Sequence, residues 1–233
     1  PNNGEAENVR VYTREGKVYE GTFQLCNASV HVNKDYSSAP RTFDSCEVVL
    51  DERVESAKDT AALGIQVGDI VCFDPRTRRT ESGYLKSRFL DDKLSVGILY
   101  GFAKYIADHQ ITPKRKTYVY ITVYEEVGHG AAWIPEVITE LLAVDMGCIG
   151  LDLECTEFDV SICAKDSSGP YDYEMTTRLI KMAKEQDLDY AVDIYPMYGS
   201  DASAALGGGA NIRAALIGPG VASSHGMERT HID

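Results

Sequence analysis

Four short clusters of acidic and histidine side chains fall where helices or strands are expected to begin or end. Their members are Asp91 with Asp92, Glu125 with Glu126, Asp145, and the pair His225 and His231. Residues at strand ends and helix starts of an α/β sheet line its ligand crevice. Together the clusters provide what a two-metal hydrolase needs: a bridging carboxylate, ligands for each ion and a free carboxylate as general base.

The chemistry of such a centre explains why these residue types are needed. Two divalent ions about 3.5–4 Å apart lower the pKa of a bound water and polarise a scissile carbonyl. Adjacent glutamates can then divide two tasks, because one side chain binds metal while its neighbour takes the proton from water. Glu125 and Glu126 are the natural candidates for that division.

Each cluster also has an ordinary structural interpretation. The two aspartates can cap the following helix and complement its dipole. The adjacent glutamates can end a solvated strand, Asp145 can open a turn, and the histidine pair can lie in a surface loop without function. For any one cluster, the structural interpretation is about as good as a metal site or better. The presence of four such clusters in one chain favours the metal site.

The elements that must position these clusters alternate between helix and strand along residues 83–233. Helices are expected over 92–108, 136–142, 173–185 and 202–206, and strands over 117–124, 142–145, 158–163, 190–195 and 212–217. Alternation of this kind predicts an α/β domain, in which helices cover both faces of a mixed sheet.

Residues 1–82 have a different pattern, dominated by short β-rich runs. Strands are expected over 9–13, 18–25, 29–33, 46–51 and 70–73, with one short helix over 56–63. A hairpin turn is indicated between the first two runs, at residues 14–17. Many short strands separated by turns predict a small barrel or sandwich. The sequence thus indicates two domains.

Composition restricts the class of protein. The chain is 44% hydrophobic and 25% charged, which is sufficient for a folded core, and its net charge of −13 disfavours nucleic acid and anionic membranes as partners. Six cysteines are scattered without a CxxC pair, as in a cytoplasmic protein with reduced thiols. No run of 18 apolar residues predicts a membrane span.

With these motifs in order, the sequence resembles the M42 family of dinuclear metallo-aminopeptidases, the glutamyl aminopeptidase-like enzymes. The resemblance is carried by residues 86–93, 125–128, 143–147, 164–170, 198–202 and 217–231. Each motif is short, but six occur in the family's order. The resemblance implies a zinc-peptidase-like catalytic domain at 83–233 and, at 1–82, the small β-barrel that this family inserts into it.

The resemblance also implies a role for each site residue. It implies that Asp91 bridges two metal ions and is joined to Asp92 by a cis peptide, with Asp92 among the catalytic residues. It implies that Glu125 is the general base. The remaining ligands that it implies are Glu126 and His225 for one ion and Asp145 for the other. His225 is preferred to His231 because its distance from residues 217–218 matches the family's ligand histidine. Asp201 is expected to cap a short helix, with a part in shaping the substrate pocket as the less favoured alternative.

The cofactors and partners follow from the same resemblance. It implies two divalent metal ions per chain, with zinc first and cobalt or manganese as alternatives, since all three suit carboxylate and imidazole ligands. The substrates would be peptides that lose their N-terminal residue, and the family assembles into large homo-oligomers, often dodecamers. Neither nucleic acid nor a membrane is expected as a partner.

The sequence departs from the family at one ligand. The family's first metal-binding histidine lies in a His-x-Asp motif upstream of the barrel, and that motif is missing here. His31 lies within an expected strand and is a poor substitute. The sequence is therefore expected to be an incomplete catalytic domain that lacks the N-terminal segment with this histidine, and to be inactive or weakly metallated alone.

Two other functions were weighed. A glycoside hydrolase of the endoglucanase type would use two carboxylates as acid and nucleophile or base. Sugar-binding sites favour many aromatic residues, and this sequence has a single tryptophan, Trp133. A non-catalytic, degenerate peptidase scaffold would explain the missing histidine, but the intact Glu125–Glu126 pair argues against it.

Overall fold

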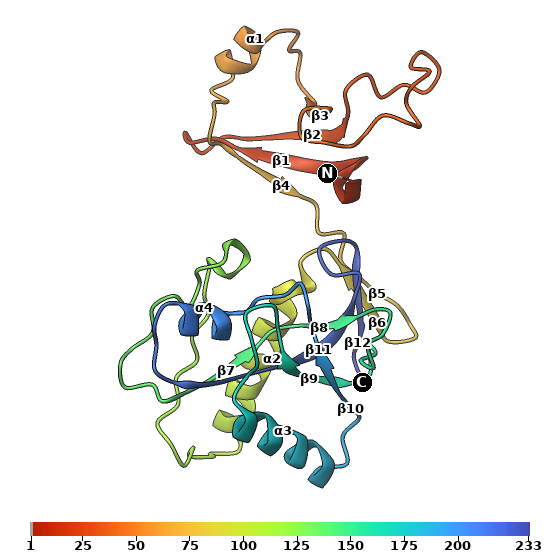
Figure 1. Cartoon of the computed structure of the whole chain (residues 1–233). Coiled ribbons are helices and arrows are strands. Elements are labelled where there is room, and N and C mark those ends of the chain that lie inside the picture. Colours follow the sequence, from red (N-terminus) through yellow and green to blue (C-terminus); the bar gives the residue numbers. More distant parts are fainter. Residues whose placement is uncertain (1) are drawn as a thin grey trace. The chain divides into compact units, whose positions relative to one another are not determined.

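The computed structural model describes residues 2–233, which form two compact units divided between Arg76 and Thr77 (Figure 1). The sequence placed this division between residues 82 and 83. Residues 77–82 join the second unit because the strand β5 (Arg78–Arg79) pairs with β6 (Tyr84–Ser87), which in turn pairs with the last strand of the chain. No helix in the described part of the chain is both long and apolar enough to cross a membrane.

The first unit is built on one antiparallel sheet. Its elements are η1 (Asn2–Gly4), β1 (Glu7–Tyr12), β2 (Val18–Leu25), β3 (Cys46–Leu50), α1 (Ala57–Ala62) and β4 (Ile70–Phe73). The strands lie in the order β3-β2-β1-β4. Side chains of β1 alternate between buried and exposed, so that Val9 and Val11 pack inward with Phe23 and Leu25.

The closed barrel expected for this unit is not seen. Among residues 2–233 no pairing joins β3 to β4, so the four-stranded sheet is open. The strand expected over 29–33 is also replaced by turns. Val30 and Val32 are 57% and 75% exposed there, and β-branched residues favour strands only where a neighbouring surface covers them.

The second unit has a mixed sheet centred on the ten-residue strand β11. Besides β5 and β6, its elements are α2 (Leu90–Asp108), η2 (Glu125–Val127), β7 (Glu140–Val144), β8 (Gly147–Ile149), β9 (Val160–Lys165), α3 (Tyr173–Glu185), β10 (Tyr190–Ile194), α4 (Asp201–Gly207), β11 (Arg213–Ala222) and β12 (Glu228–His231). β11 runs parallel to β7 and β8 and antiparallel to β9 and β12. The α/β class with a mixed sheet is therefore confirmed.

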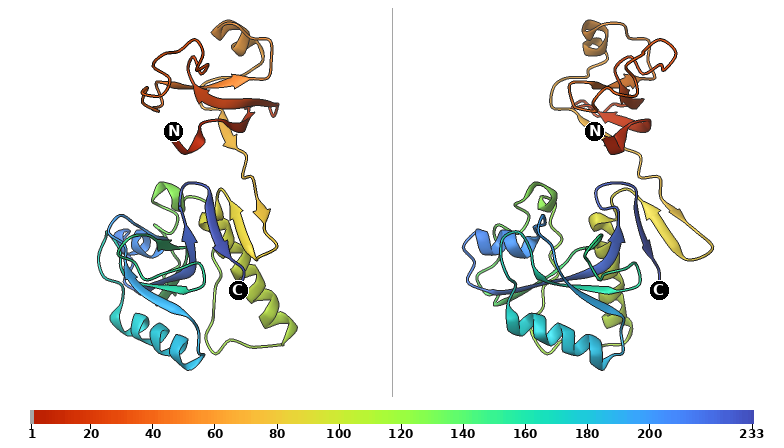
Figure 2. Two further views of the ribbon diagram at one scale, coloured as in Figure 1. Left: turned by 90° about the vertical axis from the view of Figure 1, so that its right-hand side faces the viewer. Right: turned by 45° about the vertical axis from the view of Figure 1, so that its right-hand side comes forward.

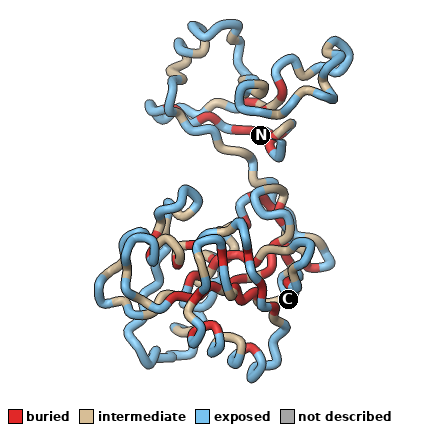
Figure 3. Tube along the Cα trace, viewed as in Figure 1, coloured by how far each residue is buried: buried red, intermediate tan, exposed pale blue. Residues whose placement is uncertain are grey.

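Helices pack against this sheet and bury its centre. α3 contacts β9 and β11, α4 contacts β7 and β11, and α2 contacts β11 and β12. α3 and α4 lie on opposite sides of the sheet (Figures 1 and 2). Buried residues concentrate along the strands between them (Figure 3), where Leu216 and Cys163 pack with Tyr195 and Ala202. β11 therefore forms the spine from which the surrounding loops are positioned.

The start of α3 shows how well local signals predicted some elements. The helix occupies Tyr173–Glu185, the range expected from its apolar spacing, and the side chain of Asp172 accepts a hydrogen bond from the Met175 N–H. Such a cap satisfies one of the N–H groups that have no partner within the helix. The boundary was therefore encoded locally.

Two elements expected in the second unit are also absent from the described structure. Residues 117–124 form no strand, although they are β-branched and aromatic. Tyr118, Val119 and Ile121 are each about half exposed, with no adjacent strand or core surface to cover them. The helix expected over 136–142 is a turn that leads into β7, because the β-branched run at 137–139 loses side-chain freedom in a helix.

Candidate metal centre

The first carboxylates of the site lie at the N-terminus of α2. The peptide between Asp91 and Asp92 is cis, as the family resemblance implied, and both residues have non-helical backbone angles inside the assigned helix. One turn later the buried hydroxyl of Ser95 donates a hydrogen bond of 3.0 Å to the Asp145 carbonyl. This bond ties the start of α2 to the residue that follows β7.

Asp145 is held where β7 leaves the sheet. Its N–H donates to the Ile217 carbonyl at 2.9 Å, and its Oδ1 accepts the Met146 N–H at 2.6 Å. The neighbouring residue on β11 must be glycine, since a Cβ on Gly218 would lie 1.6 Å from the Asp145 carbonyl oxygen. The Asp145 side chain is consequently buried, with 7% of the residue exposed.

Glu125 and Glu126 lie on a loop rather than at the end of a strand. They form the short 3₁₀ turn η2, which ends at Gly128 in the left-handed region. Asp201 at the start of α4 holds this loop, because its Oδ2 accepts the Thr122 hydroxyl at 2.7 Å and its Oδ1 accepts the Ala131 N–H at 2.8 Å. Asp201 thus anchors the loop on both sides of the glutamate pair. It is not the helix cap expected from sequence, because the N-cap of α4 is Ser200, whose side chain accepts the Ser203 N–H.

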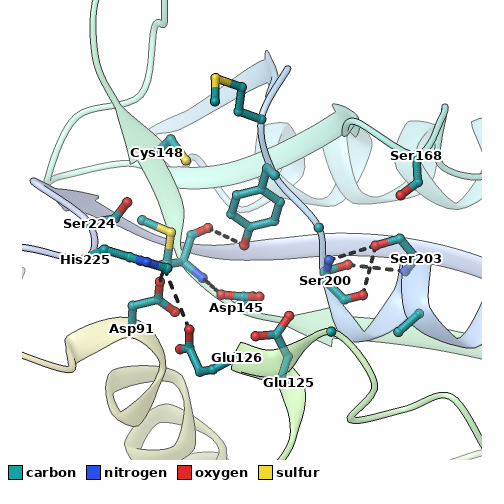
Figure 4. A pocket seen from close by; sticks show the side chains of 16 residues that line it. Asp91, Glu125, Glu126, Asp145, Cys148, Ser168, Ser200, Ser203, Ser224 and His225 are labelled. Carbon is teal, nitrogen blue, oxygen red and sulfur yellow. Dashed lines mark hydrogen bonds and ion pairs between the residues drawn. The ribbon is translucent and has the colours of Figure 1, made fainter. Parts of the chain in front are cut away.

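The two candidate histidines are placed very differently. The Nε2 of His225, in the turn between β11 and β12, lies 3.2 Å from Asp91 Oδ2 and 3.7 Å from Glu126 Oε2 (Figure 4). By contrast, the ring of His231 packs against Tyr84 and Phe158 and is bonded to a backbone carbonyl, that of Ser82. The fold therefore brings His225, and not His231, to the carboxylates.

The side chains assemble into two groups that could hold a metal ion. One contains Asp91, Glu126 and His225, and the other contains Asp91, Asp92 and Asp145; within each, the potential ligand atoms lie within 4.8 Å of one another. Asp91 belongs to both. The sequence had assigned Asp92 to catalysis, and the structure brings it beside Asp145. Glu125 belongs to neither group and lines the cavity next to them.

Burial and mutual repulsion raise the pKa values of these carboxyl groups. Loss of solvent is the largest cause at each, followed by neighbouring carboxylates at Asp91, Asp92 and Glu125, whose pKa values rise to about 7, 8 and 8. The pKa of Asp145 rises to about 6, since burial outweighs the hydrogen bond from the Met146 N–H. Desolvated like charges of this kind favour a bound cation.

One buried oxygen gives a direct test of whether metal fits. Among the described residues, Asp92 Oδ1 is buried and has no hydrogen-bond partner. A buried polar atom in that state is costly, and coordination to a cation would satisfy it. Carboxylates with one imidazole are suitable ligands for zinc, cobalt or manganese. The residues present therefore fit divalent ions.

The cluster opens into a cavity of about 590 Å³. Carboxylates and His225 line one side (Figure 4). The rest of the lining includes neutral residues: Cys148, Ser168, Met197, Tyr198, Ser200, Ser203 and Ala204. This arrangement combines a charged reactive end with space for an uncharged part of a ligand.

Sequence reasoning did not single out Glu228, the residue that holds two candidate ligands by their backbones. It lies three positions after His225 and is only 1% exposed. Its Oε2 accepts the Asp91 N–H at 3.0 Å, and its Oε1 accepts the His225 N–H at 2.9 Å. The available signal was an acidic residue in β12, a strand of the sheet. Acidic side chains are rarely buried without specific partners.

A mixed α/β sheet that presents carboxylates and one imidazole to a cavity is typical of metal-dependent hydrolases. The profile of the M42 glutamyl aminopeptidase family matches residues 1–233, and the chain belongs to this family. It is thus a member of a metallopeptidase family, whose enzymes hydrolyse peptide bonds.

Individual relatives agree with this assignment. The chain is 47% identical over 231 residues to the "Putative aminopeptidase YhfE" of Bacillus subtilis (strain 168), covering 99% of this chain and 67% of that protein. It matches the TET aminopeptidase of Thaumarchaeota archaeon SCGC AB-539-E09 with a TM-score of 0.82 at 17% identity, over 99% of this chain and 67% of the other. The TET1 peptidase of Pyrococcus horikoshii matches with a TM-score of 0.77 at 21% identity, over 98% and 68%.

Proposed function

We propose that this chain carries the two-metal centre of an aminopeptidase that removes N-terminal residues from peptides. The observation that supports this most is the position of Asp91, which is shared by two groups of potential ligands. A carboxylate common to two sites is what a bridging ligand requires. Asp92 Oδ1, buried without a partner among the described residues, gives independent support for a cation.

In this proposal the ligands divide as the sequence predicted, with one addition. Asp91 would be common to both sites, Glu126 and His225 would complete one of them, and Asp145, with Asp92 beside it, would serve the other. When bound, the ions supply Lewis acidity and lower the pKa of the attacking water. Zinc is the first candidate, with cobalt and manganese as alternatives for the same ligands.

Glu125 is proposed as the general base. Its carboxylate lines the cavity but belongs to neither ligand group, so it is available to take a proton from water and deliver it to the leaving amine. The acidic surroundings also attract the ammonium group of a peptide N-terminus. Together these features account for hydrolysis at the first residue of a chain.

Assembly and location are further parts of the proposal. The TET1 peptidase of Pyrococcus horikoshii assembles into a tetrahedron or a large octahedral shell, which supports a homo-oligomer here. The first unit is proposed as the counterpart of the family's inserted barrel domain. A cytoplasmic location stays a prediction, supported by the six free cysteines of the described chain. The endoglucanase-like and degenerate-scaffold alternatives are not favoured over the aminopeptidase function of the family.

The proposal is tested by Glu125→Gln in the polypeptide that carries this sequence. Release of chromogenic amines from a panel of aminoacyl substrates should fall about 10²–10⁴-fold, while the metal content by elemental analysis stays unchanged. Glu136→Gln, an exposed glutamate further along the same loop, is the matched control and should remain active. A chelator should abolish hydrolysis by the unaltered protein. Full activity of Glu125→Gln would exclude the assigned base, and metal-free, chelator-resistant hydrolysis would exclude the centre.

A further inference from the structure

Glu228 makes an unusual connection between two of the proposed ligands. Its two carboxylate oxygens accept the backbone N–H groups of Asp91 and His225, at 3.0 and 2.9 Å. Asp91 lies in the first turn of α2, 137 residues from Glu228 in the sequence. His225 lies in the turn before β12, 3 residues from Glu228. One side chain therefore spans two segments that local structure does not join.

The position of this carboxylate is poorly explained by fold stability alone. Glu228 is 1% exposed, and a buried charge loses its hydration. Two N–H donors offset part of that loss. A negative charge at this point becomes favourable once a cation occupies the cluster.

The two hydrogen bonds that Glu228 accepts bear directly on the distance between the side chains of Asp91 and His225. The Nε2 of His225 and the Oδ2 of Asp91 are 3.2 Å apart, although their backbones belong to different elements. The His225 side chain is 72% exposed and its residue has a left-handed φ of 61°. Packing therefore covers little of the imidazole, and the backbone of the turn, which Glu228 holds, determines where the ring begins.

We propose that Glu228 is a positioning residue that sets the separation of Asp91 and His225 for metal binding. This inference rests on the proposed metal centre, because it assigns a partner to two of its ligands. Groups that orient metal ligands typically contribute a factor of about 10–100 in metal affinity. Glu228 acts through backbone N–H groups, so it needs no contact with the ion.

The test is Glu228→Gln, which keeps the size of the side chain but turns an amide N–H₂ toward one of the two backbone donors. Zinc affinity, measured by competition with a chromophoric chelator, should weaken about 10–100-fold. The visible absorption spectrum of the cobalt form should change, since it reports ligand geometry. Glu228→Asp, which keeps the charge but has a shorter reach, should give an intermediate affinity.

Asp193→Asn is the matched control. Asp193 is also buried, with 7% exposed, and its two oxygens accept the N–H groups of Glu154 and Cys155 at 3.0 and 3.1 Å. It does not line the cavity of the metal cluster. A purely structural role for Glu228 predicts that both variants lose stability and that neither changes the cobalt spectrum; positioning predicts a spectral change for Glu228→Gln alone.

A measurement on the unaltered chain covers the case in which the variants do not fold. Because Glu228 accepts hydrogen bonds from the Asp91 and His225 amides, both amides should exchange hydrogen slowly, and addition of zinc should slow the exchange further. Rapid exchange at either amide would overturn the inference. If Glu228→Gln binds zinc as tightly as the unaltered chain, the positioning role of Glu228 is overturned but the proposed metal centre is not. If the unaltered chain binds no metal, both are overturned.

Discussion

The two sides of the candidate centre are held in different ways. Asp91 and His225 are joined through their backbones by the fully buried Glu228. Glu125 and Glu126 lie on an exposed loop that Asp201 holds from outside, through Thr122 and Ala131. The positions of Asp91 and His225 depend on the packing of α2 against the sheet. The positions of Glu125 and Glu126 depend on a single aspartate at the start of α4.

This difference teaches which side is preorganised. A ligand whose backbone is fixed by a buried, charge-assisted hydrogen bond has few alternative conformations. Breaking that hydrogen bond would leave a buried carboxylate without partners. A loop with exposed backbone opens at lower cost. Metal binding should accordingly depend most on the buried side, whereas alignment of the general base should depend on the loop.

The largest expected effect is that of Asp91→Ala, which removes the residue shared by the two ligand groups. Metal content should fall in both sites together, with affinity weaker by more than about 100-fold and hydrolysis lost, since a ligand contributes more than the groups that orient it. Elemental analysis and zinc competition measure this directly. Asp108→Ala, at the exposed end of the same helix, is the control. Loss of only one ion would show that Asp91 does not bridge.

Asp201→Ala should have the next largest effect, larger on activity than on metal content, although the loop carries the proposed ligand Glu126 as well as Glu125. Releasing Thr122 and Ala131 lets the Glu125 loop move, and we expect kcat to fall at least about 10-fold, as misplaced catalytic groups do. Asp201→Asn keeps an acceptor for the Ala131 N–H and should restore most of kcat. Loss of bound metal in Asp201→Ala would erase the distinction between the two sides.

The stability of the metal-free protein should depend on pH in an unusual direction. The folded pKa values of Asp92 and Glu125 are raised to about 8, above unfolded values near 4. Groups with raised folded pKa values contribute stability below about pH 4 that is lost as pH rises toward 8. The Tm of the metal-free chain should therefore fall between pH 5 and pH 8, and zinc should reverse the fall. A Tm that rises over this range would contradict the repulsion inferred for the cluster.

The two histidines give the smallest and most selective contrast. His231→Ala should lower stability by about 1–2 kcal/mol, through lost aromatic packing and a lost hydrogen bond, and leave zinc affinity unchanged. His225→Ala should weaken zinc binding with little effect on stability, because its side chain is 72% exposed. Denaturant unfolding and zinc competition on both variants separate the two roles; equal behaviour would refute their assignment.

Much of this molecule was determined by the sequence itself. The apolar spacing located α3, β-rich runs beside a hairpin signal located β1 and β2, and the acidic and histidine clusters named every side chain of the two candidate ligand groups. These signals are local, since a helix turn, a cap or a hairpin needs only residues close in the chain. For that reason they were readable without the fold.

Only the tertiary structure decided the rest. Residues 117–124 have strand-forming side chains but no adjacent strand in the described structure, and the open sheet of the first unit depends on pairings that span many residues. The packing of His231 away from the carboxylates, and the hydrogen bond from the Asp91 N–H to Glu228, likewise depend on how β12 joins the sheet beside α2. Contacts between residues 137 positions apart leave no periodic trace in the sequence, because only the assembled sheet brings their backbones together.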